Sequence, residues 1–369
     1  MATALSVPSS FFLLVILSNF FIPHLATNDT TPLVFILGDS TADVGTNNHL
    51  NQSDIKANFP HNGIDFPHSR STGRFSNGFN SADYLAKLFG LRRSPPPFLS
   101  LLTLEPHHFR KHLFKGVNFA SAGSGLLDTT GSNLTVVALS EQITQLTTVR
   151  DNFTAMIGSN ATEAMLSEAL FFISIGSNDI FGYFANKSTM PKEKFISTLI
   201  STYSAHITTL YGLGARKFGI ISVPPIGCCP SQRLVQKIIT GKDDCFNSTN
   251  DFAQTFYSAL DNLLHNITSQ LPGIKYSLGN SFKMTMDVIA NATLYEFTNV
   301  KAACCGHGDL KAQGPCNQTA SLCPDRREYL FWDLFHPTKK ASDLAAETLY
   351  SGTTDYVSPI NFSQLPYDN

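Results

Sequence analysis

Five short runs of apolar and β-branched residues recur along this chain, and longer stretches with helical spacing separate them. The runs are Leu33–Leu37, Gly116–Ala120, Leu170–Ile175, Lys217–Val223 and Ile274–Leu278. Helices are predicted at Ser81–Phe89, Phe195–Leu213, Asp251–Leu271 and Ala341–Leu349. Continuous apolar runs are typical of strands buried on both faces. Their alternation with helices predicts an open, mostly parallel sheet with helices on both sides.

The composition is that of one globular domain. Hydrophobic residues make up 43% of the 369 residues and charged residues only 15%, with a formal net charge of -2. This balance provides a large core but no basic surface for nucleic acid. No repeat and no linker rich in Gly, Ser or Pro divides the chain. We therefore predict one α/β domain over residues 31–357 and an irregular tail at 358–369, with the oligomeric state left open.

Residues 1–26 are predicted to be a secretory signal peptide. Phe11–Leu17 opens an apolar run that is short for a membrane span, which needs ~20 apolar residues. No second stretch of this kind follows, so the mature protein is expected to have no stable membrane span. An uncleaved N-terminal anchor is the alternative. We expect secretion to the extracellular space or the cell wall.

Sequons for N-linked glycosylation are frequent, and their density agrees with secretion. Such a density is hard to reconcile with a cytosolic protein, and glycans would solubilise a surface that is poor in charge. The candidate positions are Asn28, Asn51, Asn133, Asn152, Asn160, Asn186, Asn247, Asn266, Asn291, Asn317 and Asn361.

The seven cysteines form two groups, which are Cys228, Cys229 and Cys245, and then Cys304, Cys305, Cys316 and Cys323. In an oxidising compartment, clustered cysteines form disulfides. Zinc is the alternative because His307 lies within the second group, but the spacing matches no standard pair of Cys-x2-Cys arms. We predict disulfides and no metal. The odd number leaves at least one thiol unpaired or paired between molecules, and the connectivity stays open.

A serine after the first strand is the strongest candidate for a reacting group. Ser40 follows the run Leu33–Leu37 within Gly38-Asp39-Ser40-Thr41, and the carboxyl ends of parallel strands collect functional loops. The Gly-x-Ser-x-Gly elbow of α/β-hydrolases is absent, because Ala42 stands where the final glycine would be.

Near the other end of the chain, Asp333 precedes His336 by three residues. Pro337 predicts that a helix begins there, and both a turn and a helix bring side chains at this spacing together. Asp333 would then orient one ring nitrogen of His336 while the other faces Ser40. Nucleophile, base and base-orienting carboxylate are the reacting groups of a serine hydrolase.

Two further loops offer donors for the negative oxygen that develops during acyl transfer. The Ser40 N–H is one donor, the backbone of Gly123–Gly125 is a second, and the Asn178 amide is a third. Each loop follows one of the first three predicted strands, so all three are expected at one sheet edge. The alternative for each loop is an ordinary tight turn.

Other charged residues near these segments have simpler interpretations. Asp39 and Asp179 are expected to hold turns together by hydrogen bonds rather than to act as acids. Arg70 and Arg74 are expected to be satisfied within their own loop rather than to bind an acidic substrate.

Together these segments resemble the plant-type GDSL esterase/lipases of the SGNH hydrolase superfamily, over about residues 33–352. The matching blocks are Gly38-Asp39-Ser40 with Asp43–Asn48, Thr72–Gly78, Gly116–Gly125, Gly176–Asp179 and Asp333–Thr338. Several blocks in this order are specific, whereas one Gly-Asp-Ser would not be. Thr41 stands where the family has its leucine, and we expect little effect from this departure.

The resemblance implies a flavodoxin-like, three-layer αβα sandwich around a mostly parallel, five-stranded sheet, the SGNH hydrolase fold, without a metal or cofactor. It makes Ser40 the nucleophile, His336 the base and Asp333 its partner. It also places Ser40, Gly123 and Asn178 in the oxyanion hole.

The expected function is that of a secreted, glycosylated serine esterase or lipase that cleaves carboxylic esters through an acyl-enzyme. The substrate would be a small-molecule or lipid ester, or an acylated polysaccharide. The close alternative is an acyltransferase that passes the acyl group to an alcohol, a choice that depends on how well water is excluded. A non-catalytic lipid- or glycan-binding protein is less expected, because all three reacting groups are present.

Overall fold

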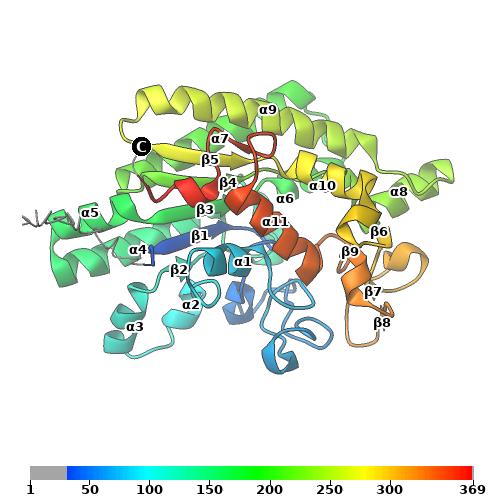
Figure 1. Ribbon diagram of the computed structural model, residues 1–369, viewed down its shortest axis with the longest axis horizontal. Coiled ribbons are helices and arrows are strands. Elements are labelled where there is room, and N and C mark those ends of the chain that lie inside the picture. The colour runs from blue at the N-terminus through cyan, green and yellow to red at the C-terminus, as the bar shows by residue number, and fades with distance from the viewer. Residues whose placement is uncertain (1–30, 368–369) are drawn as a thin grey trace, which may run out of the picture. The chain divides into compact units, whose positions relative to one another are not determined.

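The computed structural model describes residues 31–367, so the expected signal peptide and Asn28 lie outside the described residues (Figure 1). Its strands are β1 Val34–Gly38, β2 Val117–Asn118, β3 Leu170–Ser174, β4 Lys217–Ile221, β5 Lys275–Gly279, β6 Asn299–Ala303, β7 Cys305–Gly306, β8 Ser321–Leu322, β9 Tyr329–Phe331 and β10 Val357–Ser358. Its α-helices are α1 Ser81–Leu88, α2 Phe98–Leu101, α3 Pro106–Leu113, α4 Leu139–Ile157, α5 Ser159–Glu168, α6 Ser177–Ala185, α7 Lys192–Gly212, α8 Pro230–Thr240, α9 Asn247–Gln270, α10 Ser281–Ala290 and α11 Lys339–Ser351. Among the helices of residues 31–367, none combines the length and the apolar character that a membrane crossing requires.

The central sheet has the strand order β10-β5-β4-β3-β1-β2. Strands β1 to β5 run parallel to their neighbours, and β10 pairs with β5 in the antiparallel sense. The order of the five parallel strands is that of flavodoxin-like folds. The predicted α/β fold with a mostly parallel sheet is therefore confirmed, with one antiparallel edge strand beyond the five expected.

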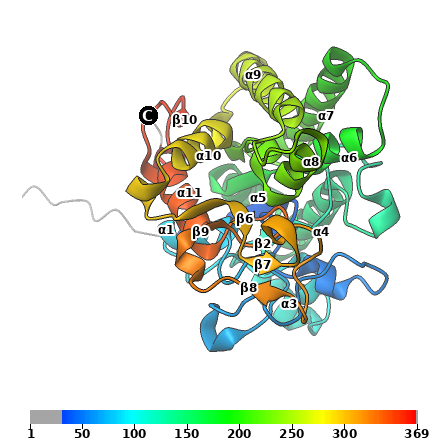
Figure 2. The ribbon, with the colours of Figure 1, turned by 90° about the vertical axis from the view of Figure 1, so that its right-hand side faces the viewer.

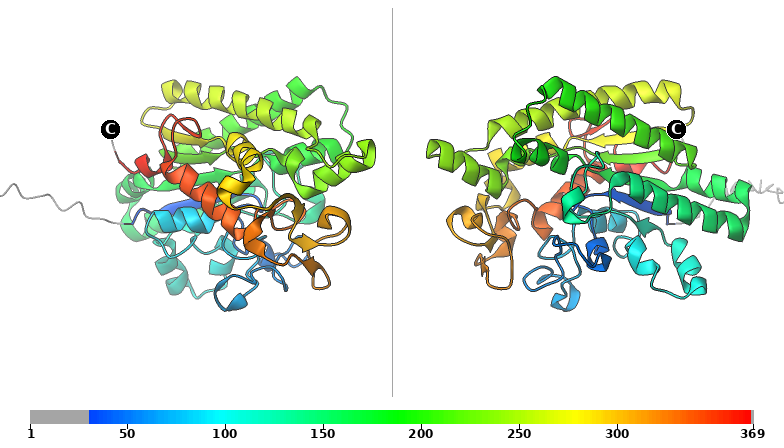
Figure 3. Two further views of the ribbon diagram at one scale, coloured as in Figure 1. Left: turned by 45° about the vertical axis from the view of Figure 1, so that its right-hand side comes forward. Right: turned by 180° about the vertical axis from the view of Figure 1, so that it is seen from behind.

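Alternate residues of β1 and β3 belong to two different cores, one on each face of the sheet. In β1, Phe35 and Leu37 pack with residues of α4, α7 and α9. Val34 and Ile36 pack with residues of α1, α10 and α11. Figure 3 shows the two helix layers from opposite sides of the sheet. Burial on both faces explains why the strands read as continuous apolar runs.

The predicted helices are present as α1, α7, α9 and α11, with shifted ends. The last helix does not begin at Pro337. Thr338 accepts a hydrogen bond from the Ala341 N–H and caps the helix, so α11 starts at Lys339.

The segment after residue 357 is not a wholly irregular tail. Ser358 completes β10, and a short 3-10 helix follows at Phe362–Gln364. Phe362 and Leu365 are fully buried against the core that contains Phe172. These apolar residues close one end of the layer between the sheet and α11.

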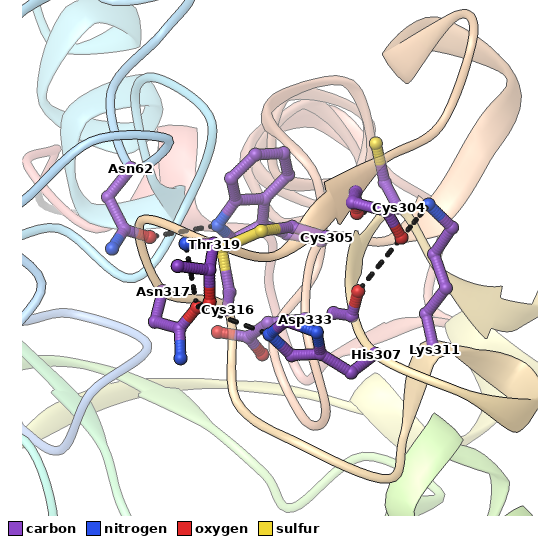
Figure 4. The surroundings of a disulfide bond; sticks show 12 residues. Asn62, Cys304, Cys305, His307, Lys311, Cys316, Asn317, Thr319 and Asp333 are labelled. Carbon is purple, nitrogen blue, oxygen red and sulfur yellow. Dashed lines mark hydrogen bonds between the residues drawn. A yellow bond between two sulfur atoms is a disulfide. The ribbon is translucent and has the colours of Figure 1, made fainter.

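The predicted disulfides are confirmed, and they pair as Cys228–Cys245, Cys304–Cys323 and Cys305–Cys316. Cys229 is buried and free. The His307 ring shares a hydrogen bond of 3.2 Å with the Asn317 side chain rather than facing a cysteine cluster (Figure 4). Within residues 31–367, no group of three or more His, Cys, Asp or Glu side chains is arranged to hold a metal ion.

A buried ion pair connects the loop at residues 72–78 to α1. Arg74 bonds both carboxylate oxygens of Asp83, with Nε–Oδ2 at 2.6 Å and Nη2–Oδ1 at 2.8 Å. The same carboxylate accepts the Asn80 N–H as part of a capping box at the start of α1. Arg74 is therefore satisfied, as predicted, but its main partner is Asp83 of α1 rather than a group of its own loop.

Replacing Arg74 with alanine should destabilise the protein by about 3–5 kcal/mol, because the Asp83 carboxylate would remain buried without its partner. Chemical denaturation with intact disulfides measures the free energy of unfolding. The matched control is Arg92→Ala, at an exposed arginine, which should change stability by less than about 0.5 kcal/mol. Equal stabilities for the two variants would contradict a structural role for the pair.

Candidate active site

The loop that carries Ser40 continues directly from β1 and lies tightly against β3. The Asp39 N–H donates to the Ser174 carbonyl at 3.1 Å. A Cβ atom on Gly38 would lie 2.2 Å from that same carbonyl oxygen, so only glycine fits there. Ser40 is half-buried and lines a cavity at this edge of the sheet.

The structure brings Ser40, His336 and Asp333 together. Ser40 Oγ lies 2.7 Å from Nε2 of His336. The other ring nitrogen, Nδ1, lies 2.8 Å and 2.9 Å from the two carboxylate oxygens of Asp333. Oδ1 of Asp333 also accepts the backbone N–H groups of Phe335 and His336, both at 2.9 Å. The predicted turn thus fixes the carboxylate and the ring in one geometry.

Asp333 and His336 are buried, each with 8% of its residue surface exposed, and each stabilises the charge of the other against the effect of burial. Burial raises the pKa of Asp333, but the charge and hydrogen bond of His336 outweigh it, so the net pKa lies below the ordinary value. Burial lowers the pKa of His336, but Asp333 and, more weakly, Asp39 outweigh it, and the pKa lies above its ordinary value. Asp333 therefore favours a protonated ring.

The turn that carries His336 is anchored outside the central sheet. β9 pairs with β6 and leads into the turn, and β7 pairs with β8 beside them (Figure 2). Trp332 is fully buried, and its indole N–H donates to Asn62 Oδ1 at 2.9 Å (Figure 4). The Trp332 carbonyl accepts from Cys305, which is held by a disulfide.

The three expected oxyanion donors line the same cavity as Ser40 Oγ. Gly123 has a φ of 87°, in the left-handed region that favours glycine. Within residues 31–367, the N–H groups of Ser40 and Gly123 donate no internal hydrogen bond, so both are free for a ligand. Asn178 uses one amide hydrogen to bond the Ser124 carbonyl at 2.8 Å, which leaves the second hydrogen free. Gly125 does not line the cavity, because it packs against Asp179.

Buried aspartates hold these loops in position, as predicted for Asp39 and Asp179. Asp179 accepts from the N–H groups of Leu126 and Leu127 and from the Thr130 hydroxyl. Burial raises its pKa to about 6 against these hydrogen bonds. Asp39 accepts from the backbone and the hydroxyl of Thr41.

Thr41 and Asp43 extend this network around Ser40. The Thr41 hydroxyl also shares a hydrogen bond of 2.9 Å with the Ser174 hydroxyl. Asp43 accepts the N–H groups of Gly45, Thr46 and Ala122, and burial raises its pKa to about 6. The loops after β1, β2 and β3 are therefore connected by acceptors that water does not reach.

Gln142 is a positioning residue that the sequence analysis missed. Its Oε1 accepts the Gly38 N–H at 2.9 Å, and its Nε2 donates to the Gly38 carbonyl at 2.9 Å and to Ser124 Oγ at 3.3 Å. Gln142 is fully buried on α4, far from Gly38 in sequence. The helical spacing of Leu139, Ile143 and Leu146 predicts α4 and places Gln142 on the apolar face of that helix. Nothing in the local sequence indicates that Gln142 bonds to Gly38.

The cavity at the site has a volume of about 1160 Å³. Apolar side chains form most of its wall, and the charged groups that reach it include Asp39, Asp333 and His336. Phe75 packs against the His336 ring, with centroids 5.0 Å apart. This combination of an apolar cavity and a few convergent polar groups is typical of small-molecule sites.

Comparison with known proteins identifies the class of this site. A model of the family "GDSL-like Lipase/Acylhydrolase" matches residues 34–349. The Arabidopsis thaliana GDSL esterase/lipase At5g55050 is 37% identical over 341 residues, which cover 90% of this chain and 89% of that protein. At1g71250 of the same plant is 35% identical over 355 residues, covering 93% and 91%. The GDSL esterase/lipase LTL1 is 33% identical over 351 residues, covering 93% of each.

The chain therefore belongs to the GDSL lipase/acylhydrolase family, which confirms the resemblance found in its motifs. It is accordingly an enzyme, a carboxylic ester hydrolase.

Gln142→Leu should lower kcat/KM for a short-chain p-nitrophenyl ester by on the order of 10²-fold, because small displacements of a reacting group have effects of this size. The substitution removes the partner of the Gly38 N–H two residues before Ser40. The matched control is Gln145→Leu on the same helix, because within residues 31–367 Oε1 of Gln145 is buried without a hydrogen-bond partner. Equal activity of the two folded variants would contradict the positioning role.

Proposed function

We propose that this protein is a secreted serine esterase in which Ser40 is the nucleophile, His336 the general base and Asp333 its orienting carboxylate. The observation that carries the proposal is the chain of contacts from Ser40 Oγ through the His336 ring to Asp333, at 2.7 Å and 2.8 Å. A serine hydroxyl is a weak nucleophile at its own pKa, and an adjacent oriented base is what activates it.

In the first half of the proposed reaction, Ser40 Oγ attacks the ester carbonyl while His336 Nε2 accepts the hydroxyl proton. The carbonyl oxygen becomes negative, and the N–H groups of Ser40 and Gly123 and the free Asn178 amide hydrogen bind it. Asp333 stabilises the imidazolium that forms, in keeping with its effect on the His336 pKa. The protonated ring then donates its proton to the departing alkoxide, and the acyl group remains on Ser40.

The second half repeats these steps with water. His336 takes a proton from water as the oxygen attacks the acyl-enzyme, and returns that proton to Ser40 Oγ as the carboxylic acid leaves. Preorganised donors aimed at the developing oxyanion are each worth on the order of 10²-fold in rate. The loops that carry these donors are held by buried hydrogen bonds within the protein, which supports donors that are already in position before the reaction.

Secretion and glycosylation belong to the same proposal. The three disulfides and the sequon density support an oxidising, extracellular setting. Most sequon asparagines among the described residues are exposed and accessible for modification, namely Asn51, Asn133, Asn160, Asn186, Asn247, Asn266 and Asn291. Asn152, Asn317 and Asn361 are half-buried.

Ser40→Ala should lower hydrolysis of short-chain p-nitrophenyl esters by on the order of 10³-fold or more, because Ser40 Oγ is the hydroxyl that contacts His336 Nε2. The matched control is Ser269→Ala at an exposed serine of α9, which should retain full activity. Full activity of Ser40→Ala would overturn the mechanism. Products formed with an added alcohol separate hydrolysis from acyl transfer.

Activity should rise with pH as His336 loses its proton, because only the neutral ring can accept the Ser40 proton. Since Asp333 raises the pKa of His336, this rise should lie above the ordinary histidine range. Asp333→Asn should move the rise to lower pH, with a smaller upward effect of Asp39 remaining, and lower kcat by on the order of 10⁴-fold.

The measurement is the pH profile of kcat/KM for both proteins, with Asp355→Asn, at an exposed aspartate, as the matched control. A rise that stays at the wild-type pH in Asp333→Asn would contradict the proposed role of the carboxylate.

A further inference from the structure

We propose that a basic face at the end of the molecule away from Ser40 binds an acidic polysaccharide and tethers the protein to it. The basic face consists of five exposed side chains, which are Arg92, Arg93, Arg110, Lys111 and Lys115. The two arginines at 92 and 93 follow α1, and the other three residues belong to α3 or follow it directly. The choice of partner rests on the proposed secretion, whereas the basic face does not depend on the esterase mechanism.

The near-neutral charge of the whole chain conceals a local excess of cations. Residues 92–115 contain five of the 26 Lys and Arg residues of the chain but one of its 28 Asp and Glu residues, Glu105. The remaining residues hold 21 Lys and Arg against 27 Asp and Glu. Positive charge is therefore concentrated in one segment of a chain that is otherwise acidic. Such an asymmetry creates a local positive potential that attracts anions.

The fold brings the two parts of the basic face together. A Cβ atom on Gly116 would lie 3.0 Å from Cγ of Pro95, so the stretches that contain these residues are in contact. Two residues further along both stretches, the chains form a parallel β-bridge. Because the stretches run in the same direction, the residues that come just before them lie on the same side. Arg93 is therefore a neighbour of Lys115.

The cations of the basic face have no counter-ion inside the protein. Within residues 31–367, none of their side chains forms an ion pair or a hydrogen bond. By contrast, Arg74 is fully paired with Asp83. The helix dipole favours cations at the C-terminal end of α3, but it does not act on Arg92 and Arg93. The local concentration of charge thus has no complete explanation in the stability of the fold.

The basic face is open to solvent and separate from the cavity. Lys115 precedes β2 at the amino ends of the strands, whereas Ser40 follows β1 at the carboxyl ends. Figure 1 shows α3 at one end of the molecule and the turn after β9, which carries His336, at the other. Sequons flank this region at Asn51 and Asn133, and the sequence has none between them. A polymer on the basic face therefore leaves the cavity accessible to an ester.

The basic face presents charge rather than apolar surface, which favours a polymer over a membrane. A helix that binds a membrane surface inserts its apolar face, but the apolar face of α3 is packed in the core. Leu113 is fully buried, and Phe109 packs against Phe98 with ring centroids 6.3 Å apart. The anionic leaflet of a cell membrane is also the cytoplasmic one, which a secreted protein does not meet. The exposed apolar side chains nearby lie before or after α3 and are Leu102, Leu104 and Phe114.

The cations are spread along the surface, which favours a long anion over a small one. Helix α3 alone is about 12 Å long, at the rise of an α-helix. A small anion would contact one or two of these side chains. A chain with repeated carboxylates contacts several at once, because each contact raises the effective concentration of the next carboxylate. Acidic polysaccharides are chains of this kind outside the cell, and arginine binds their carboxylates in bidentate fashion.

The first test measures binding of the secreted wild-type protein to beads that carry polygalacturonate, with dextran beads as the uncharged control. We expect binding to polygalacturonate alone in about 0.01 M NaCl. Affinity should fall about tenfold or more at about 0.3 M NaCl, because salt screens exposed charges. An absence of binding at low salt, or binding that salt does not weaken, would contradict the proposal.

The second test removes charge from the basic face. The triple variant Arg110→Gln, Lys111→Gln and Lys115→Gln should bind polygalacturonate about tenfold more weakly or less, because the local positive potential is reduced. Glutamine is chosen because its helix propensity resembles that of arginine and lysine. The double variant Arg92→Gln and Arg93→Gln tests the other segment and should also weaken binding. Wild-type affinity in both folded variants would rule out the basic face.

The matched control removes the same number of positive charges from exposed positions elsewhere. It is the triple variant Arg70→Gln, Lys194→Gln and Lys242→Gln, which should keep wild-type affinity for polygalacturonate. If the two triple variants lose affinity equally, binding depends on the total charge of the protein and the proposal is wrong. Capture of the wild-type protein by phosphatidylserine vesicles but not by polygalacturonate would also overturn it, in favour of a membrane partner.

Hydrolysis of p-nitrophenyl butyrate separates this inference from the proposed function. Both triple variants should hydrolyse this ester at the wild-type rate, because none of the substituted residues lines the cavity. If the wild-type protein hydrolyses no ester but the binding pattern holds, the esterase mechanism fails and the basic face stands. If esters are hydrolysed but polygalacturonate is not bound, the basic face is wrong and the mechanism stands.

Discussion

The double hydrogen bond between the Gln142 side chain and the backbone of Gly38 is the contact on which the site depends. Gly38 is the last residue of β1, so the hydrogen bonds of its N–H and carbonyl fix the position from which the chain continues to Asp39 and Ser40. The same carbonyl accepts from Ser124 Oγ at 2.9 Å, which ties the loop after β2 to the loop after β1. Because these groups are buried, folding removes their hydrogen bonds to water, and this cost is offset only when the internal hydrogen bonds of the network form together.

Electrostatics around Ser40 follow from this dry environment. Asp39, Asp43 and Asp179 lie close to the reacting groups and have pKa values that burial raises, although each accepts several hydrogen bonds. Asp333 alone among these four has a lowered pKa, because it faces the His336 ring in addition to neutral backbone donors. Asp333 thus pairs with the His336 ring, whereas the other three carboxylates accept hydrogen bonds that hold the loops in place.

Much of the fold could be predicted because each relevant signal is local. The runs that became β1 and β3 are apolar over nearly their whole length, and those that became β4 and β5 are mostly apolar after an initial lysine, since both faces of the sheet are covered. The antiparallel strand β10 was missed because two residues carry no periodic pattern. Helix α11 starts at Lys339 rather than at the predicted Pro337. The hydrogen bond by which the Thr338 hydroxyl caps this helix depends on three-dimensional geometry, and amino-acid composition does not reveal it.

By itself, the sequence determined the class of fold, the family and the residue types that carry the chemistry, because the spacing of the motifs and the alternation of strands with helices are visible along the chain. Only the tertiary structure decided which groups meet. It brought His336 to 2.7 Å from Ser40, paired the cysteines, left Cys229 free, and turned Gln142 toward Gly38. These contacts join residues that are distant in the chain, and their geometry depends on how the helices pack on the sheet. Local patterns of polarity and spacing do not specify that packing.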